Sequence, residues 1–179
     1  LIMIASFCFI SSAVYIMNDI IDIEKDKLHP VKSKRPVAHG DISKRTALVT
    51  LLSLFILSTI LAYHISIICA IIVLSYFTLN VLYSFKLKQF AIIDMACIAI
   101  GFILRIVAGC YAIKVMPSPL VILMTFFVSM FFTSMKRKLE IQLLTDIKDG
   151  RDSIRELGVN TVNQFILINA ILSISFYFT

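Results

Sequence analysis

Three aspartates stand three and four residues apart near the start of the chain, and this spacing suits the binding of a metal ion. Asp19, Asp22 and Asp26 follow an apolar segment, and Asn18 precedes them. On a helix that turns ~100° per residue, positions with this spacing fall on one face. Stacked carboxylates repel one another, so a compensating cation is expected. Hard oxygen ligands in such a row favour Mg²⁺, which keeps part of its water and bridges to substrate phosphates. A solvated helix end is the alternative interpretation.

Basic residues follow the aspartates in a segment that two prolines interrupt. Lys32, Lys34 and Arg35 lie between Pro30 and Pro36, which exclude a continuous helix. Cationic side chains beside a metal–phosphate site neutralise negative charge on a leaving group. We therefore expect a loop that folds back over the aspartates and binds substrate through these three residues. Loop charge that only orients a membrane protein is the alternative for each of them.

The elements that carry these residues belong to a membrane protein. The chain is 59% hydrophobic and 16% charged, whereas soluble proteins average about 45–50% and about 25%. Apolar runs of roughly 20 residues, the length that a bilayer requires, predict an all-α polytopic transmembrane bundle. Six helices are expected, over about 1–22, 46–63, 66–85, 91–113, 117–135 and 161–179. Because the chain starts and stops within apolar runs, we expect a single domain, 1–179, truncated at both ends.

The distribution of charge predicts the orientation of the bundle. Fifteen of the seventeen Lys and Arg residues fall in the segments 18–45, 86–90 and 136–160, which alternate with the predicted spans. The positive-inside rule places these segments in the cytoplasm. The same rule accounts for the net charge of +6, so a nucleic-acid partner is not needed to explain it. The aspartates then face the cytoplasm.

The motif around the aspartates resembles a known family. "NDIIDIEKD", followed by "KSKRP" and "HGDIS", is similar to the first Asp-rich motif, NDxxDxxxD, of the UbiA superfamily of intramembrane prenyltransferases. The resemblance implies a UbiA-type helical bundle in which this motif binds Mg²⁺ and a diphosphate. By match, Asp19, Asp22 and Asp26 become the metal-binding and catalytic residues, and Asn18 contacts substrate. It also implies a polyprenyl lipid substrate, a diphosphate-bearing co-substrate and a surrounding lipid membrane, expected to be a bacterial cell membrane.

Later segments resemble one branch of that superfamily, the decaprenyl-phosphate phosphoribosyltransferases of cell wall biosynthesis. Residues 85–113 and "SMKRKLE" at 134–140 carry this likeness. The segment after them does not show the second DxxxD motif that is typical of aromatic prenyltransferases. The branch resemblance implies further substrate contacts at Lys86, Lys88, Asp94, Arg105, Lys136, Arg137 and Glu140. A local helical pair between Arg137 and Glu140 is the alternative there.

Arg105 lies within a predicted span, where a charge costs about 2.5–3.5 kcal/mol on insertion scales. It shares a helical stripe with Asp94 and Gly101, flanked by Cys97 and Ala108, so this stripe should face the bundle interior. Asp94 and Arg105 are eleven positions apart, which amounts to roughly 16 Å of helix and is too far for direct pairing. Arg105 therefore either contacts an anionic substrate group or bonds to backbone carbonyls as a packing residue.

These expectations favour one function and leave two others open. The favoured function is Mg²⁺-dependent transfer of 5-phosphoribosyl from phosphoribosyl diphosphate to a polyprenyl phosphate. The first alternative is transfer of a prenyl group from prenyl diphosphate to an aromatic acceptor. The second is a polytopic transporter or an inactive relative. Transporters place ionisable groups near the midplane, whereas these carboxylates gather at one end of the spans, which favours an enzyme.

Overall fold

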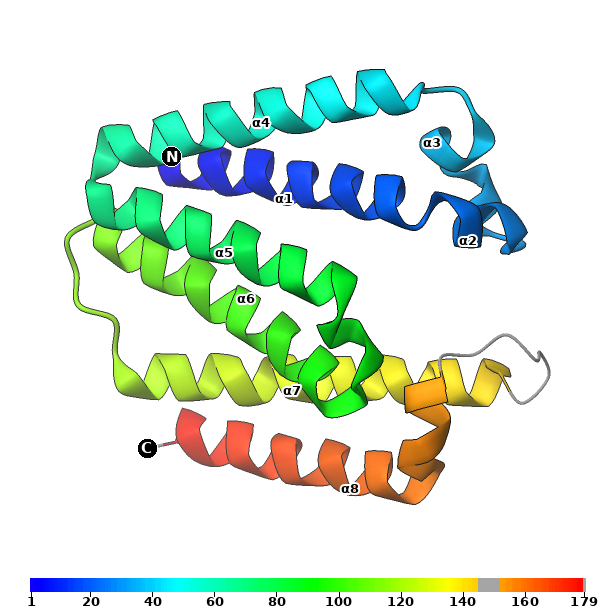
Figure 1. Ribbon diagram of the computed structural model, residues 1–179. Helices are drawn as coiled ribbons and strands as arrows, with labels where there is room; N and C mark the ends of the chain where they lie inside the picture. The colour runs from blue at the N-terminus through cyan, green and yellow to red at the C-terminus, as the bar shows by residue number, and fades with distance from the viewer. Residues whose placement is uncertain (145–151, 179) are drawn as a thin grey trace. The chain divides into compact units, whose positions relative to one another are not determined.

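The protein is built from long helices joined by short ones (Figure 1). The computed structural model describes the backbone of residues 1–144 and 152–178; the side chains of Ala91, Glu140 and 142–159 lie outside the description. Within these residues the long helices are α1 (Ile2–Ile21), α4 (Lys44–Ile65), α5 (Ile67–Phe85), α6 (Ala91–Ala112), α7 (Pro119–Leu144) and α8 (Asp152–Tyr177). The short ones are α2 (Ile23–Leu28), η1 (Lys32–Lys34), α3 (Pro36–His39) and η2 (Leu87–Gln89). The predicted all-α fold with six long helices is confirmed.

Five of the long helices in the described part of the chain are long and apolar enough to cross a membrane. They comprise Ile2–Ile21, Lys44–Ile65, Ile67–Phe85, Ile92–Ala112 and Pro119–Leu139. Between 17% and 33% of the most apolar window of each is buried inside the protein, so most of their apolar surface faces outward. Such surface is compatible with lipid and unfavourable in water. The chain is therefore a multi-pass integral membrane protein.

Three helix boundaries differ from the prediction: α8 begins at Asp152 and not at 161, and the start of α4 and the end of α7 differ for local reasons. Helix α4 begins at Lys44 because Ser43 caps it, with the Ser43 side chain accepting a hydrogen bond of 3.1 Å from the Thr46 amide. Helix α7 continues to Leu144, well beyond the expected end at 135. Residues 136–144 include neither proline nor glycine and consist largely of strong helix formers. The first residues of the predicted cytoplasmic segment 136–160 are therefore helical.

The first of two compact units, Leu1–Ser84, contains the aspartates. Helices α1 and α4 lie side by side in it (Figure 1). At their contact Ser6 and Ser58 are fully buried, and each hydroxyl donates to the other residue's carbonyl, at 2.9 and 2.8 Å. Small side chains let two helices approach closely. Helix α5 joins the unit through an edge-on contact of the Phe7 and Tyr76 rings, whose centroids are 5.5 Å apart.

The second unit, Phe85–Thr179, is organised around α7. Helix α7 lies along α8 and also packs on α6 (Figure 1). Met95 and Ala99 of α6 and Met130 of α7 form a buried apolar cluster, with Phe126 against it. This packing fixes which faces of α6 and α7 meet, and so determines which of their polar residues come together.

Candidate active site

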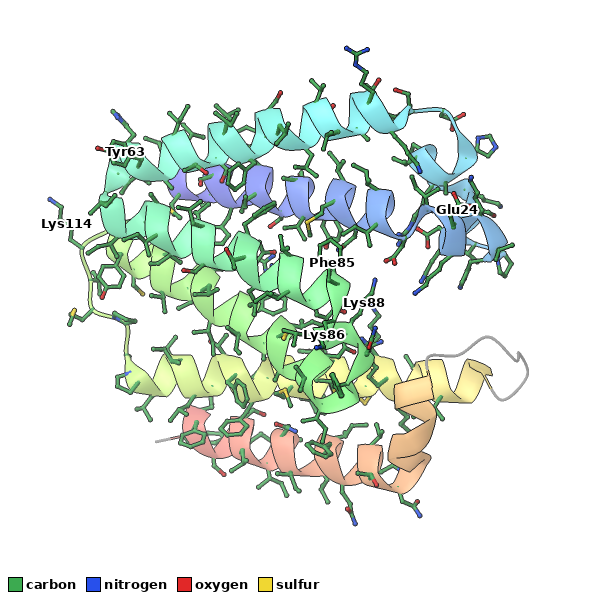
Figure 2. The ribbon with its side chains drawn as sticks, in the orientation of Figure 1. Glu24, Tyr63, Phe85, Lys86, Lys88 and Lys114 are labelled. Atoms are coloured by element: carbon green, nitrogen blue, oxygen red, sulfur yellow. The ribbon has the colours of Figure 1, made fainter. Side chains whose placement is uncertain are left out.

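The aspartates lie at a joint between two helices, and not on one helix as predicted. Helix α1 ends at Ile21 and α2 begins at Ile23, with Asp22 between them at φ −94° and ψ 9°. Hydrogen bonds with helical spacing nevertheless cross the joint, from the Asp22 amide to the Asn18 carbonyl at 2.9 Å and from the Asp26 amide to the Asp22 carbonyl at 2.8 Å. Aspartate is a poor helix former, which is consistent with a break at this residue. Figure 2 labels Glu24 on α2, beyond the joint.

Arg35 bridges the first and last aspartates. Its Nη1 atom donates to Asp19 Oδ1 and to Asp26 Oδ2, both at 2.9 Å. The Asp26 side chain is only 5% exposed and that of Asp19 25%, while Arg35 is 39% exposed. Arg35 precedes Pro36, the first residue of α3, and has the extended backbone (φ −65°, ψ 139°) usual before proline. The loop thus folds back over the end of α1, as expected.

A serine that the sequence analysis did not assign holds Asn18. Ser84 near the end of α5 is buried, and its hydroxyl lies within hydrogen-bond distance of the Asn18 side-chain oxygen and, at 2.8 Å, of the Asn80 carbonyl. This contact joins residues 66 positions apart in the chain. Asn18 is therefore fixed beside the aspartates by α5. Ser84 directly precedes the segment 85–113 that carries the branch resemblance, and this position is the signal that could have identified it.

The remaining predicted residues of the loop are exposed. Lys32 and Lys34 lie in η1, on the same segment as Arg35, and both side chains face solvent. Asp22 is half-buried at the joint. The structure thus brings Asp19, Asp26 and Arg35 together and leaves the two lysines available beside them.

A second charged pair is buried in the other unit. Asp94 of α6 and Arg137 of α7 form an ion pair, with side chains 1% and 6% exposed. The alternative pairing of Arg137 with Glu140 cannot be compared, because the Glu140 side chain lies outside the described residues. Both Asp94 and Arg137 were predicted to contact substrate. Their burial against each other gives them a structural role that the sequence analysis did not identify, since 43 residues separate them.

The other predicted basic residues occupy different parts of the second unit. Lys86 immediately precedes η2 and Lys88 lies within it, in the unit's first loop (Figure 2). Arg105 is half-buried in α6, with its guanidinium carbon 5.1 Å from the centroid of the Phe102 ring, a cation–π contact within its own helix. As expected for an inward-facing stripe, Asp94, Cys97 and Ala108 are buried.

A groove of about 510 Å³ runs between α6 and α7. Its lining is mainly apolar and comprises Phe102, Met124, Thr125, Val128, Ser129, Phe132, Thr133 and Lys136. Residues from successive turns of α7 follow its length, so the exposed Lys136 stands at one end. Lys136 was predicted to contact substrate. The groove itself was not predicted from the sequence.

The sequence profile of the UbiA prenyltransferase family matches residues 1–178. The chain belongs to this family. It is 37% identical over 141 residues to decaprenyl-phosphate phosphoribosyltransferase of Corynebacterium glutamicum, and 32% identical over 137 residues to the enzyme of that name from Mycolicibacterium smegmatis. Each alignment covers 76% of this chain and 42% or 43% of the relative. This UbiA-family chain thus spans less than half the length of the curated relatives it matches.

The solved structures agree with this assignment at the level of fold. A UbiA homologue from Archaeoglobus fulgidus, bound to DMAPP and Mg²⁺, superimposes with a TM-score of 0.83 at 17% identity. The match covers 98% of this chain and 64% of that one. The predicted UbiA-type fold is confirmed.

The UbiA-family motif of this chain has a donor set that suits Mg²⁺ but does not form a complete metal site. Asp19 and Asp26 supply hard oxygen atoms that already converge on one cationic group, the Arg35 guanidinium. In the part of the chain that the structure describes, no three His, Cys, Asp or Glu residues are grouped closely enough to hold a metal. Mg²⁺ usually needs only one or two carboxylates, with water and phosphate completing its shell. The assignment of all three aspartates to a metal therefore stays a prediction.

Proposed function

We propose that this UbiA-family protein is a Mg²⁺-dependent transferase that moves 5-phosphoribosyl from phosphoribosyl diphosphate to a polyprenyl phosphate. One observation carries the proposal: two carboxylates at the end of a membrane helix converge on a single cationic group, beside a basic loop. The relatives named decaprenyl-phosphate phosphoribosyltransferase, at 31–37% identity, support this choice of substrates.

The residues of the first unit bind the diphosphate in this proposal. Asp19 and Asp26, with Asp22 at the joint, hold Mg²⁺, which when bound offsets charge on the departing diphosphate. Asn18, positioned by Ser84, directs its amide toward the same group. Lys32, Lys34 and Arg35 add positive charge where negative charge develops as the bond from ribose C1 to the diphosphate breaks. An arginine offers two parallel donors to a phosphate, whereas each lysine acts as a point charge.

The groove of the second unit suits the lipid. Its apolar lining matches a polyprenyl tail, and Lys136 at its end is placed to meet the lipid phosphate. A phosphate oxygen is already ionised at neutral pH, so it can attack ribose C1 without a strong general base. Lys86 and Lys88 are further candidates for phosphate contacts, and so is the half-buried Arg105. The active site is proposed to face the cytoplasm of a bacterial cell, where phosphoribosyl diphosphate is made.

Prenyl transfer is the second candidate, and a specific observation favours it. Digeranylgeranylglyceryl phosphate synthase of Methanosphaera stadtmanae is 36% identical over 84 residues, or 47% of this chain. In that chemistry an allylic diphosphate loses diphosphate and a nucleophile attacks the prenyl carbon. The same aspartates and basic loop would serve the leaving group, so these residues alone do not discriminate between the two reactions.

The experiment that tests the proposal is a direct comparison of substrates in proteoliposomes. Purified protein receives labelled phosphoribosyl diphosphate with polyprenyl phosphate, or a labelled prenyl diphosphate with both an aromatic acid and a prenylglyceryl phosphate as acceptors. We expect a Mg²⁺-dependent, labelled phosphoribosyl lipid only from the first mixture. A labelled prenyl product only from the second would replace the proposal with prenyl transfer, and no product from either would contradict both.

An Asp26→Asn variant tests the assigned site within the same assay. The amide keeps the shape of the side chain but removes a charge from the bridged pair, so turnover should fall by about 10²–10³. Asp41→Asn is the matched control, because Asp41 is an exposed carboxylate that pairs with His39 at 3.0 Å. Wild-type turnover in both variants would show that Asp26 takes no part in the reaction.

A further inference from the structure

Arg35 contacts one oxygen of each of two carboxylates that are proposed to bind the metal ion. Its Nη1 atom lies 2.9 Å from both Asp19 Oδ1 and Asp26 Oδ2. A Mg²⁺ ion bound to these oxygens would approach each to about 2.0–2.1 Å. The nitrogen fills the space between them, so the guanidinium and an ion shared by these two oxygens cannot be present together.

The pair of carboxylates also needs a cation whether or not metal is bound. Asp26 is almost fully buried, and an uncompensated buried carboxylate beside a second one is strongly unfavourable. Arg35 supplies this charge in the structure. We propose that Arg35 and the divalent cation occupy this position in alternation, so that metal binding releases Arg35 from Asp19 and Asp26. The inference rests on the proposed metal role of these aspartates, and not on the choice of phosphoribosyl transfer.

The segment that carries Arg35 can move away from Asp19 and Asp26 at a small cost in free energy. It lies between the three-residue helix η1 and the four-residue helix α3, outside the long helices. The apolar side chains Leu28 and Val31 that precede Arg35 are 85% and 70% exposed, and the buried apolar contact of this segment is that of Ala38 in α3. Gly40, at φ 98°, ends α3 in a conformation that other residues rarely adopt. The two ion pairs are thus the main side-chain contacts described for Arg35.

Release gives Arg35 a second role. Once the metal neutralises the carboxylates, the guanidinium is free to bind an anion together with Lys32 and Lys34 of the same loop. A diphosphate-bearing substrate that arrives with the metal would supply that anion. The exchange therefore lets Arg35 bind the leaving diphosphate only when the metal is bound to the aspartates.

The test is a Mn²⁺ titration of the purified protein in detergent, followed by electron paramagnetic resonance with no substrate present. Arg35→Gln removes the competing cation and both of its charge-assisted hydrogen bonds, so Mn²⁺ should bind at least roughly tenfold more tightly than in the wild type. Lys34→Gln is the matched control, because it removes an equal charge from an exposed position on the same loop and should change the affinity far less. Unchanged or weaker Mn²⁺ binding in Arg35→Gln would overturn the exchange.

Thermal stability gives an independent readout. Without metal, Arg35→Gln should melt at a lower temperature than wild type, and added Mn²⁺ should raise its melting temperature by more. If Arg35→Gln does not fold, Arg35→Lys serves instead: the lysine side chain is shorter and brings its ammonium less close to the two carboxylates, so metal should again bind more tightly than in the wild type, and equal affinity would overturn the exchange. Because no substrate is present, these results stand even if the substrate assay favours prenyl transfer. Failure of Mn²⁺ to bind any variant would instead contradict the metal role itself.

Discussion

At the scale of single residues, the acidic motif and Arg105 offset the desolvation cost of their charges in different ways. The aspartates obtain a cation from a loop nine to sixteen residues away, through two ion pairs of 2.9 Å. Arg105 lies in an apolar helix over the ring of Phe102. A cation–π contact contributes about 0.5–2 kcal/mol and so offsets part of the cost of placing arginine in a membrane. The substrate contact expected of Arg105 stays a prediction.

Substitution of Arg105 separates a substrate role from a structural one. Arg105→Met keeps similar length without charge, and Arg105→Lys keeps the charge without the planar fork. If Arg105 binds an anionic substrate group, both variants should fold with normal melting temperatures and lose most activity. The measurements are melting temperature in detergent and turnover in proteoliposomes. An active Arg105→Met protein, especially a more stable one, would assign Arg105 to packing.

At the scale of helices, the Asp94–Arg137 pair connects α6 to α7 in the interior of the second unit. Both side chains are almost fully buried, so removal of one leaves the other charge without its partner. The pair positions the end of α7 on which Lys136 stands. The predicted substrate contacts at Asp94 and Arg137 therefore act first through structure, by fixing where their neighbours lie.

Asp94→Leu should destabilise the protein by about 3–5 kcal/mol, because it removes the buried carboxylate that pairs with the buried Arg137 guanidinium. The double variant Asp94→Leu with Arg137→Met should recover most of that loss, since no charge then remains buried. Unfolding in mixed micelles measures both. Lys136→Met is the control, because this exposed neighbour on α7 should change stability little. If the double variant is no more stable than the single one, the two residues do not act as a pair.

At the scale of the whole molecule, the distribution of charge predicts the side of the membrane on which each connection lies. Single cysteines at Val31 and Lys88 should react only with reagents added from the cytoplasm, and one at Met116 only from outside, in a variant whose four native cysteines are replaced. Val31 and Met116 are 70% and 83% exposed, so reagents can reach them. Labelling of Val31 and Lys88 from opposite sides would contradict the predicted topology.

The sequence by itself determined the class of fold, the positions of six helices and the family. Apolar runs of bilayer length report local properties of the chain, and a motif such as NDIIDIEKD is contiguous, so both can be read without tertiary contacts. The boundaries that the sequence missed depend on local detail: the Ser43 cap of α4, and the absence of a breaker after Met135.

The tertiary structure decided which charged residues meet. Sequence spacing placed Asp19, Asp22 and Asp26 on one helix face, but the joint at Asp22 and the return of the loop put Arg35 between the first and the last of them. In the same way, Asp94 meets Arg137 only because the apolar cluster of Met95, Ala99 and Met130 fixes how α6 packs on α7. Ion pairs between distant residues depend on how helices pack and loops fold back, and the order of residues along the chain does not specify this.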